Sequence, residues 1–93
     1  MYKAIYSRQS KLVTSLLREF RQAREMTQVE LAKKLGITQS NLSKIERGAR
    51  RIDFVELNHW ATAMGIDIGL FVAEFEARLE NPTAVAKVSK LTL

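Results

Sequence analysis

Apolar residues recur every three or four positions along most of this chain, which is the spacing of amphipathic helices. The first such stretch can begin at Ser7 or Ser10, whose hydroxyls suit a helix start, and it runs to about residue 25. Its expected inward residues are Leu12, Val13, Leu16, Leu17, Phe20 and Ala23. Residues 1–6 are compatible with a short strand, an arm or disorder, and we expect an extended arm over residues 1–7.

Two short helical patterns joined at a glycine follow. Thr27 and Glu30 have the spacing of a capping box, in which each side chain accepts a hydrogen bond from the other residue's backbone N–H. Gly36 suits the left-handed backbone conformation that ends the first of these helices. Thr38 can cap the second helix, and Gly48 ends it.

The second of these helices has an unusually dense row of short polar side chains. Its only apolar positions are Leu42 and Ile45. Its outward positions are Gln39, Ser40, Asn41, Ser43 and Lys44. Two short helices joined by a tight glycine turn form the helix-turn-helix unit, whose second helix enters the major groove of DNA. An ordinary helical hairpin with a solvated polar face is the alternative, because short apolar patterns are ambiguous.

Two further helices are predicted in the second half of the chain. Asp53 and Glu56 form a second capping box, and Gly65 ends the helix that this box opens. The expected inward residues of this helix are Phe54, Leu57, Trp60, Ala61 and Met64. Asp67 can cap a fifth helix, which stops at the Asn81–Pro82 pair. The expected inward residues of the fifth helix are Ile68, Phe71, Val72, Phe75 and Leu79.

The last residues mix small, β-branched and basic side chains without a clean period. They predict either a disordered tail or a segment that becomes ordered against a partner chain. A chain of 93 residues suffices for one domain with one core. We therefore expect a single domain over residues 8–81, preceded by the arm and followed by a tail over residues 82–93.

The charge is divided unevenly between the two halves of the chain. Residues 1–51 contain 12 Lys or Arg and 4 Asp or Glu, which gives +8. Residues 52–93 contain 3 basic and 6 acidic residues, which gives −3, and the whole chain therefore has a formal charge of +5. A basic half that contains the two short helices suits a polyanionic partner on one side of the molecule.

Several classes of protein and site are not expected. The chain has no cysteine, so disulfides and thiolate metal sites are excluded, and the lone His59 is most simply an exposed helix residue. No apolar run approaches the ~20 residues of a membrane span, and no signal-peptide segment is recognisable, so we expect a cytoplasmic protein that does not enter a membrane. No catalytic motif or cofactor-binding loop appears, so we expect neither an enzyme nor a cofactor or metal.

Residues 27–48 resemble the helix-turn-helix of the lambda-repressor and Cro-type proteins, the Xre family. The residues that carry the resemblance are Gln28, Leu31, Ala32, Gly36, Ile37, Thr38, Gln39, Ser40, Leu42, Ser43, Ile45, Glu46, Arg47 and Gly48. The resemblance extends more loosely from about Leu16 to Leu79. It implies an all-α, five-helix lambda-repressor-like DNA-binding domain with the helix-turn-helix at helices 2 and 3. Many family members have a proline in the loop after helix 3, whereas this chain has Ile52–Asp53.

The resemblance also implies an ion pair between Arg21 of the first helix and Glu46 of the recognition helix. Each follows an apolar residue of its own helix by four positions, Leu17 and Leu42 respectively. Such a pair is costly to desolvate, so it indicates a fixed helix orientation rather than high stability. Two independent surface charges are the alternative.

The candidate DNA contacts lie on the polar row and around it. We expect Gln39, Ser40 and Ser43 to read bases, with Asn41 and Lys44 at the edges of the row. Gln and Asn can bond bidentately to adenine, Lys to guanine and Ser to several bases. Gln28 is a phosphate ligand by resemblance, and the helix start around it attracts anions. The full set of expected phosphate ligands is Thr27, Gln28, Arg47, Arg50 and Arg51.

These observations favour a sequence-specific regulator that binds double-stranded DNA as a homodimer on a palindromic operator and acts as a repressor. The exposed parts of the fifth helix and the tail are the expected dimer surface. An antitoxin that binds a toxin through residues 83–93 is one alternative, because such segments often fold on binding. A helical adaptor without DNA function is another, and it predicts no salt-dependent binding to a duplex.

Overall fold

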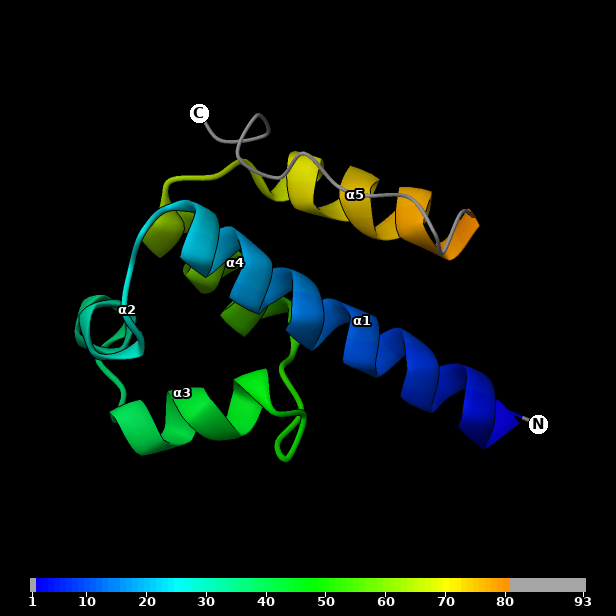
Figure 1. The fold of residues 1–93 in the computed structure, drawn as a ribbon, viewed down its shortest axis with the longest axis horizontal. Coiled ribbons are helices and arrows are strands. Elements are labelled where there is room, and N and C mark those ends of the chain that lie inside the picture. Colours follow the sequence, from blue (N-terminus) through cyan, green and yellow to red (C-terminus); the bar gives the residue numbers. More distant parts are fainter. Residues whose placement is uncertain (1, 81–93) are drawn as a thin grey trace.

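The computed structural model describes residues 2–80, with side chains from residue 8 onward, and it contains five helices in that range. They are α1 (Tyr2–Ala23), α2 (Gln28–Leu35), α3 (Gln39–Glu46), α4 (Phe54–Met64) and α5 (Ile68–Glu80). The long α1 runs across the molecule, with α3 along one edge and α5 along the opposite edge (Figure 1). The all-α class and the five-helix order are therefore confirmed. The tail over residues 82–93, and with it the antitoxin hypothesis, lies outside the described residues.

The expected extended arm at the N-terminus is wrong, because α1 begins at Tyr2. Ser7 and Ser10 lie inside the helix instead of capping it. Residues 2–10 contain neither glycine nor proline, and each residue added to an existing helix gains a backbone hydrogen bond at little cost. The packed part of α1 therefore extends backwards through a segment that has no strong helix-breaking residue.

The turn between α2 and α3 forms as the sequence predicts. Thr27 and Glu30 make the complete capping box at the start of α2. Gly36 ends α2 with φ at +71°, a left-handed conformation in which most side chains are strained. The N–H of Ile37 donates to the carbonyl of Ala32 over 3.0 Å, which closes the helix end. The Thr38 hydroxyl then accepts the N–H of Asn41 over 3.0 Å and starts α3.

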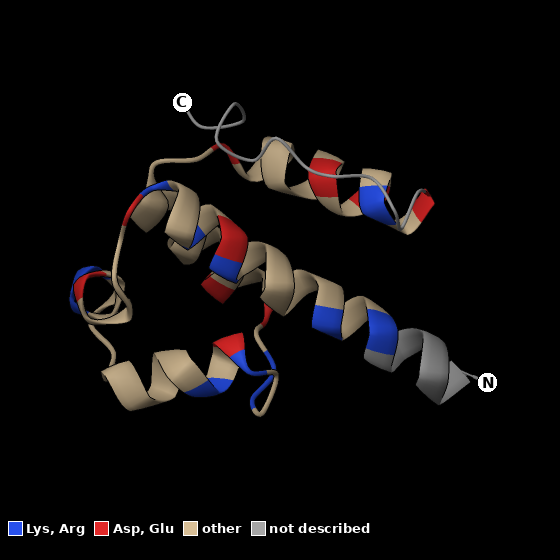
Figure 2. Cartoon of the chain, viewed as in Figure 1, with Lys and Arg blue, Asp and Glu red and all other residues tan. Residues whose placement is uncertain are grey.

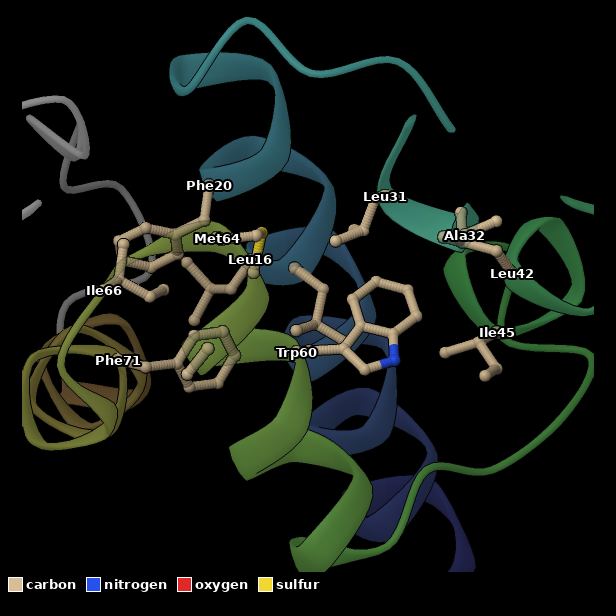
Figure 3. Close-up of a cluster of buried hydrophobic side chains, with 12 residues drawn as sticks. Leu16, Phe20, Leu31, Ala32, Leu42, Ile45, Trp60, Met64, Ile66 and Phe71 are labelled. Atoms are coloured by element: carbon tan, nitrogen blue, oxygen red, sulfur yellow. The ribbon is translucent and has the colours of Figure 1, made fainter. Parts of the chain in front are cut away.

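The hydrophobic core draws residues from all five helices (Figure 3). Phe20 of α1 and Phe71 of α5 are tilted against each other with ring centroids 5.5 Å apart. Trp60 of α4 is 2% exposed, and it lies among side chains of the other helices. The buried apolar residues are Leu16, Leu17, Phe20, Leu31, Ala32, Leu42, Ile45, Trp60, Ala61, Met64, Ile66 and Phe71. Because α3 contributes only Leu42 and Ile45 of these, most of its surface remains available to solvent.

Three residues expected in the core are exposed instead. Phe54 is 68% exposed, because it occupies the first position of α4 and the buried residues of that helix begin only at Trp60. Val72 and Leu79 of α5 are 39% and 38% exposed. Phe71 is the fully buried residue of α5, so this helix lies at the margin of the core.

No described helix is long and apolar enough to cross a membrane.

Candidate nucleic-acid interface

The polar row of α3 lies on the outside of the molecule. Gln39, Ser40, Asn41 and Lys44 are exposed, and Ser43 is half-buried. Leu42 and Ile45 face the core from the other side of the helix, so they fix which face is presented. The helix lies along one edge of the molecule, with no other described helix beyond it (Figure 1). All five residues expected to read bases are therefore on one short, accessible helix.

A buried ion pair joins α1 to the last residue of α3. The Arg21 Nε donates to Glu46 Oε2 over 2.7 Å, and its Nη2 donates to Glu46 Oε1 over 3.1 Å. The Glu46 side chain is 2% exposed and that of Arg21 is 10% exposed. The Arg21 Nη1 also donates to the Met26 carbonyl over 2.7 Å, so all three guanidinium nitrogens are used. The pair that the resemblance implies is present, and it anchors α3 against α1.

Two glutamines continue this pair to the surface. The Gln28 Nε2 donates to Glu46 Oε1 over 3.0 Å. The Gln28 Oε1 in turn accepts from Gln39 Nε2 over 2.8 Å. We name the run Arg21, Glu46, Gln28 and Gln39 the glutamine relay. It holds an expected phosphate ligand, Gln28, against an expected base reader, Gln39. No sequence spacing signals this link, because the partners lie 11 and 18 residues apart.

Some of the backbone N–H groups at the start of α2 are already hydrogen-bonded within the capping box of Thr27 and Glu30. The Thr27 N–H donates to Glu30 Oε1 over 2.8 Å. Hydrogen bonds from the backbone and the side chain of Thr27 hold the pKa of Glu30 below its ordinary value. The Thr27 hydroxyl oxygen in turn accepts from the Glu30 N–H over 3.1 Å. The next two amides, of Gln28 and Val29, lie at the positive end of the helix dipole and suit an anion.

The loop between α3 and α4, residues 47–53, contains three arginines. Arg50 Nη2 donates to Glu56 Oε2 over 2.7 Å, and Arg50 Nη1 donates to the Arg51 carbonyl over 3.0 Å. Arg50, together with the Asp53 backbone, holds the pKa of Glu56 below its ordinary value, and the same hydrogen bond raises the pKa of Arg50. The capping spacing of Asp53 and Glu56 did not reveal that Glu56 also pairs with the loop.

Basic residues gather on the side of the molecule that carries α3 and this loop, whereas the charged residues of α5, on the opposite edge, are mostly acidic (Figure 2). Of the basic residues in the first half of α1, Lys11 lines a cavity together with the loop, whereas Arg8 lines the cleft between α1 and α5. No cluster of His, Asp and Glu among the described residues has the arrangement of a metal site. An exposed polar helix beside a cationic loop is an arrangement that can bind the phosphates and base edges of DNA.

Comparison with known proteins assigns this arrangement to a family. The helix-turn-helix family matches residues 17–71, which is more than half of the chain. The chain belongs to the Xre-type helix-turn-helix family. An Xre-family-like protein from Pseudomonas syringae pv. tomato shares 36% identity with it and superposes with a TM-score of 0.77, covering 82% of this chain and 93% of that one. The Xre resemblance seen in the sequence is therefore confirmed.

Two other similar proteins differ in what they show. The clp gene regulator ClgR from C. glutamicum superposes with a TM-score of 0.70 over 84% of this chain and 96% of that chain, and at 23% identity it shows the shared fold. An uncharacterized HTH-type transcriptional regulator, y4dL, of Sinorhizobium fredii is 40% identical over 69 residues. That match covers 74% of this chain but spans only 35% of the length of the relative. Xre-type membership brings with it DNA binding in transcription regulation.

Proposed function

We propose that this chain is a sequence-specific DNA-binding repressor that acts as a homodimer on a palindromic operator. The observation that carries the proposal is the glutamine relay, which fixes Gln39 on the exposed face of α3 beside the cationic loop. A base reader needs a defined amide orientation before DNA arrives, because ordering a free side chain on binding costs affinity. Repression would follow from occupation of promoter DNA.

The base contacts would come from the polar row of α3. With one Nε2 hydrogen donated to Gln28, the Gln39 amide still has its oxygen and its second N–H, which together match adenine N6 and N7. Ser40 and Ser43 can donate or accept with several bases. Asn41 and Lys44, both exposed, would contact the margins of the half-site.

The phosphate contacts would come from both ends of the helix-turn-helix. Thr27 and Gln28 offer a hydroxyl, a side-chain amide and helix-end N–H groups at one end. Arg47, Arg50 and Arg51 offer guanidinium groups at the other end. Arg50 uses two of its N–H donors on Glu56 and the Arg51 carbonyl, so about three of its five donors are left for a phosphate.

A single copy of α3 would not select a genomic site. Each good bidentate contact discriminates by about 1–3 kcal/mol, and two or three such contacts fall short of specific binding. Two copies related by a two-fold axis would read two half-sites about 34 Å apart on one face of the duplex. The dimer contact must therefore leave both α3 helices facing the same DNA.

The start of α4 meets this requirement better than α5, which the sequence favoured as the dimer surface. α5 lies on the edge opposite α3, so pairing through its outer face would turn the two recognition helices away from each other (Figure 1). α4 begins eight residues after α3 ends, directly after the loop that contains the proposed phosphate ligands Arg47, Arg50 and Arg51. Phe54 and Val55 in that turn are 68% and 62% exposed, more than Val72 and Leu79 of α5.

Replacing Phe54 and Val55 together by serine is expected to convert the dimer to a monomer, because the exposed apolar area that supports pairing is lost. Sedimentation equilibrium measures the mass, and circular dichroism checks that the variant is folded. The matched control replaces Val72 and Leu79 by serine and should remain dimeric. If the Val72 and Leu79 variant is monomeric and the Phe54 and Val55 variant is dimeric, the dimer interface lies on α5 and not on α4.

Selection of bound duplexes from a random pool, followed by titration at several salt concentrations, tests the proposed function. We expect an inverted repeat and a linear fall of log K with log salt. Replacing Arg50 and Arg51 by alanine should weaken binding to every duplex and lower the magnitude of the salt slope by about two. Arg24→Ala serves as the control, because Arg24 lies over Gly65 at the other end of the molecule. If the wild-type protein shows no salt-dependent binding to any duplex, the proposed function is wrong, and the alternative of a helical adaptor without DNA function is favoured.

A further inference from the structure

A cavity of about 190 Å³ lies between α1 and the loop over residues 47–53. Lys11 lines it from α1, and Arg47, Arg50 and Arg51 line it from the loop. Apolar groups of Val13 and Ile52, which are both half-buried, form part of its wall. Four basic residues from two separate elements therefore line one small volume.

The charge around this cavity has one sign. None of the described residues that line it is acidic, and Arg50 pairs with Glu56, which is not a lining residue. The cleft between α1 and α5 differs, because an acidic residue, Glu19, lines it together with Arg78 and pairs with it over 2.7 Å. Like charges held close together repel, and an anion between them reverses the sign of that interaction. The cavity is thus set up for a negatively charged group.

Gly48 of the loop lies close to Thr14 of α1, and both residues line the cavity. Gly48 adopts φ of +76°, and the position of a Cβ on it would lie 3.9 Å from the Thr14 hydroxyl oxygen. Thr14 is 8% exposed, and its hydroxyl donates to the Lys11 carbonyl over 3.0 Å. A residue of the loop and a buried residue of α1 therefore lie side by side in the wall of the cavity.

The α1 side of the cavity lies outside the part of the chain that matches the helix-turn-helix family. That match begins at residue 17, whereas Ser10, Lys11, Val13 and Thr14 all precede it. Lys11 is the basic residue of this half of α1 that lines the cavity, whereas Arg8 lines the cleft on the side of α5. Lys11, from the first half of α1, therefore adds a positive charge to the cavity that residues 17–71 alone do not supply.

We infer that the cavity between α1 and the α3–α4 loop binds a phosphate group, with Lys11 as its ligand from α1. Guanidinium groups match phosphate oxygens bidentately, and a lysine adds a point charge that adapts to the remaining oxygen. The phosphate has two possible sources: the DNA backbone flanking the half-site, which rests on the proposed function, or a free phosphate that occupies the same position.

Lys11→Gln tests the site, because Lys11 is exposed and the substitution leaves the helix backbone unchanged. In the DNA arm, the magnitude of the salt slope should fall by about one relative to wild type. In the second arm, inorganic phosphate is titrated against chloride at equal ionic strength without DNA. Amide resonances of Thr14, Gly48 and Ile52 should shift in wild type and not in the variant. Arg24→Gln, the same change of charge at the far end of α1, should behave as wild type in both arms.

A lower slope without phosphate-induced shifts assigns the site to the DNA backbone, and shifts with an unchanged slope assign it to free phosphate. Both results support a phosphate site at Lys11. A Lys11→Gln protein equal to wild type in both arms overturns the inference. If wild type binds no duplex at all, the proposed function fails, and the phosphate titration still decides the cavity by itself.

Discussion

Replacing Glu46 by glutamine is expected to lower the free energy of unfolding by about 3–5 kcal/mol, because Arg21 then keeps a buried charge without its counter-charge. For a domain of this size that is a large part of the total stability. Urea unfolding followed by circular dichroism measures the change, which should appear as a lower midpoint with an unchanged slope. Loss of the hydrogen bond between Gln28 and Glu46 alone would lower the free energy of unfolding by much less.

Two further variants separate the unpaired charge from other causes. Glu56→Gln removes the acidic partner of an exposed pair, and its amide can still cap α4, so its effect should be much smaller. Replacing Arg21 and Glu46 together by methionine removes both charges and should recover most of the stability. A double variant no more stable than Glu46→Gln would show that packing, and not the unpaired charge, dominates.

Replacing Gln39 and Ser43 together by alanine is expected to relax the choice of bases while leaving affinity for unrelated DNA nearly unchanged. Each lost contact that reads a base should remove about 1–3 kcal/mol of discrimination, roughly tenfold to a hundredfold at its position. Alanine favours helix, so α3 itself is preserved. Selection from a random duplex pool shows which positions of the half-site lose their preference.

A matched control replaces Gln22 and Ser15, which are exposed residues of the same types on α1, by alanine. It should select the same sequences as wild type. If the Gln39 and Ser43 variant instead loses affinity equally on every duplex, those side chains contact the backbone, and the assignment of base readers is wrong.

Much of the fold was predictable because its local signals agree with one another. The capping boxes at Thr27 and Asp53 and the left-handed glycine at Gly36 mark helix ends through chemistry that acts within a few residues. The extended arm and the buried Phe54 were wrong for a different reason. Whether a helix continues, or whether its first turn is covered, depends on neighbours that periodicity does not describe.

The candidate site was predictable in its surface residues and not in its connections. An exposed row follows from helical spacing once Leu42 and Ile45 are assigned to the core. The Arg21–Glu46 pair was predicted only from the resemblance to the Xre family. The bonds of Gln28, the pairing of Arg50 with Glu56 and the place of Lys11 beside the loop depend on three-dimensional proximity between distant segments.

The glutamine relay has a consequence for how operator choice can evolve. Its inner end is the buried side chain of Arg21 on α1, and its outer end is the Gln39 amide, which is expected to contact a base. A substitution around Arg21 can therefore tilt that amide and favour a different nucleotide while every contacting residue stays the same. Lineages with identical recognition helices can accordingly diverge in the promoters they occupy.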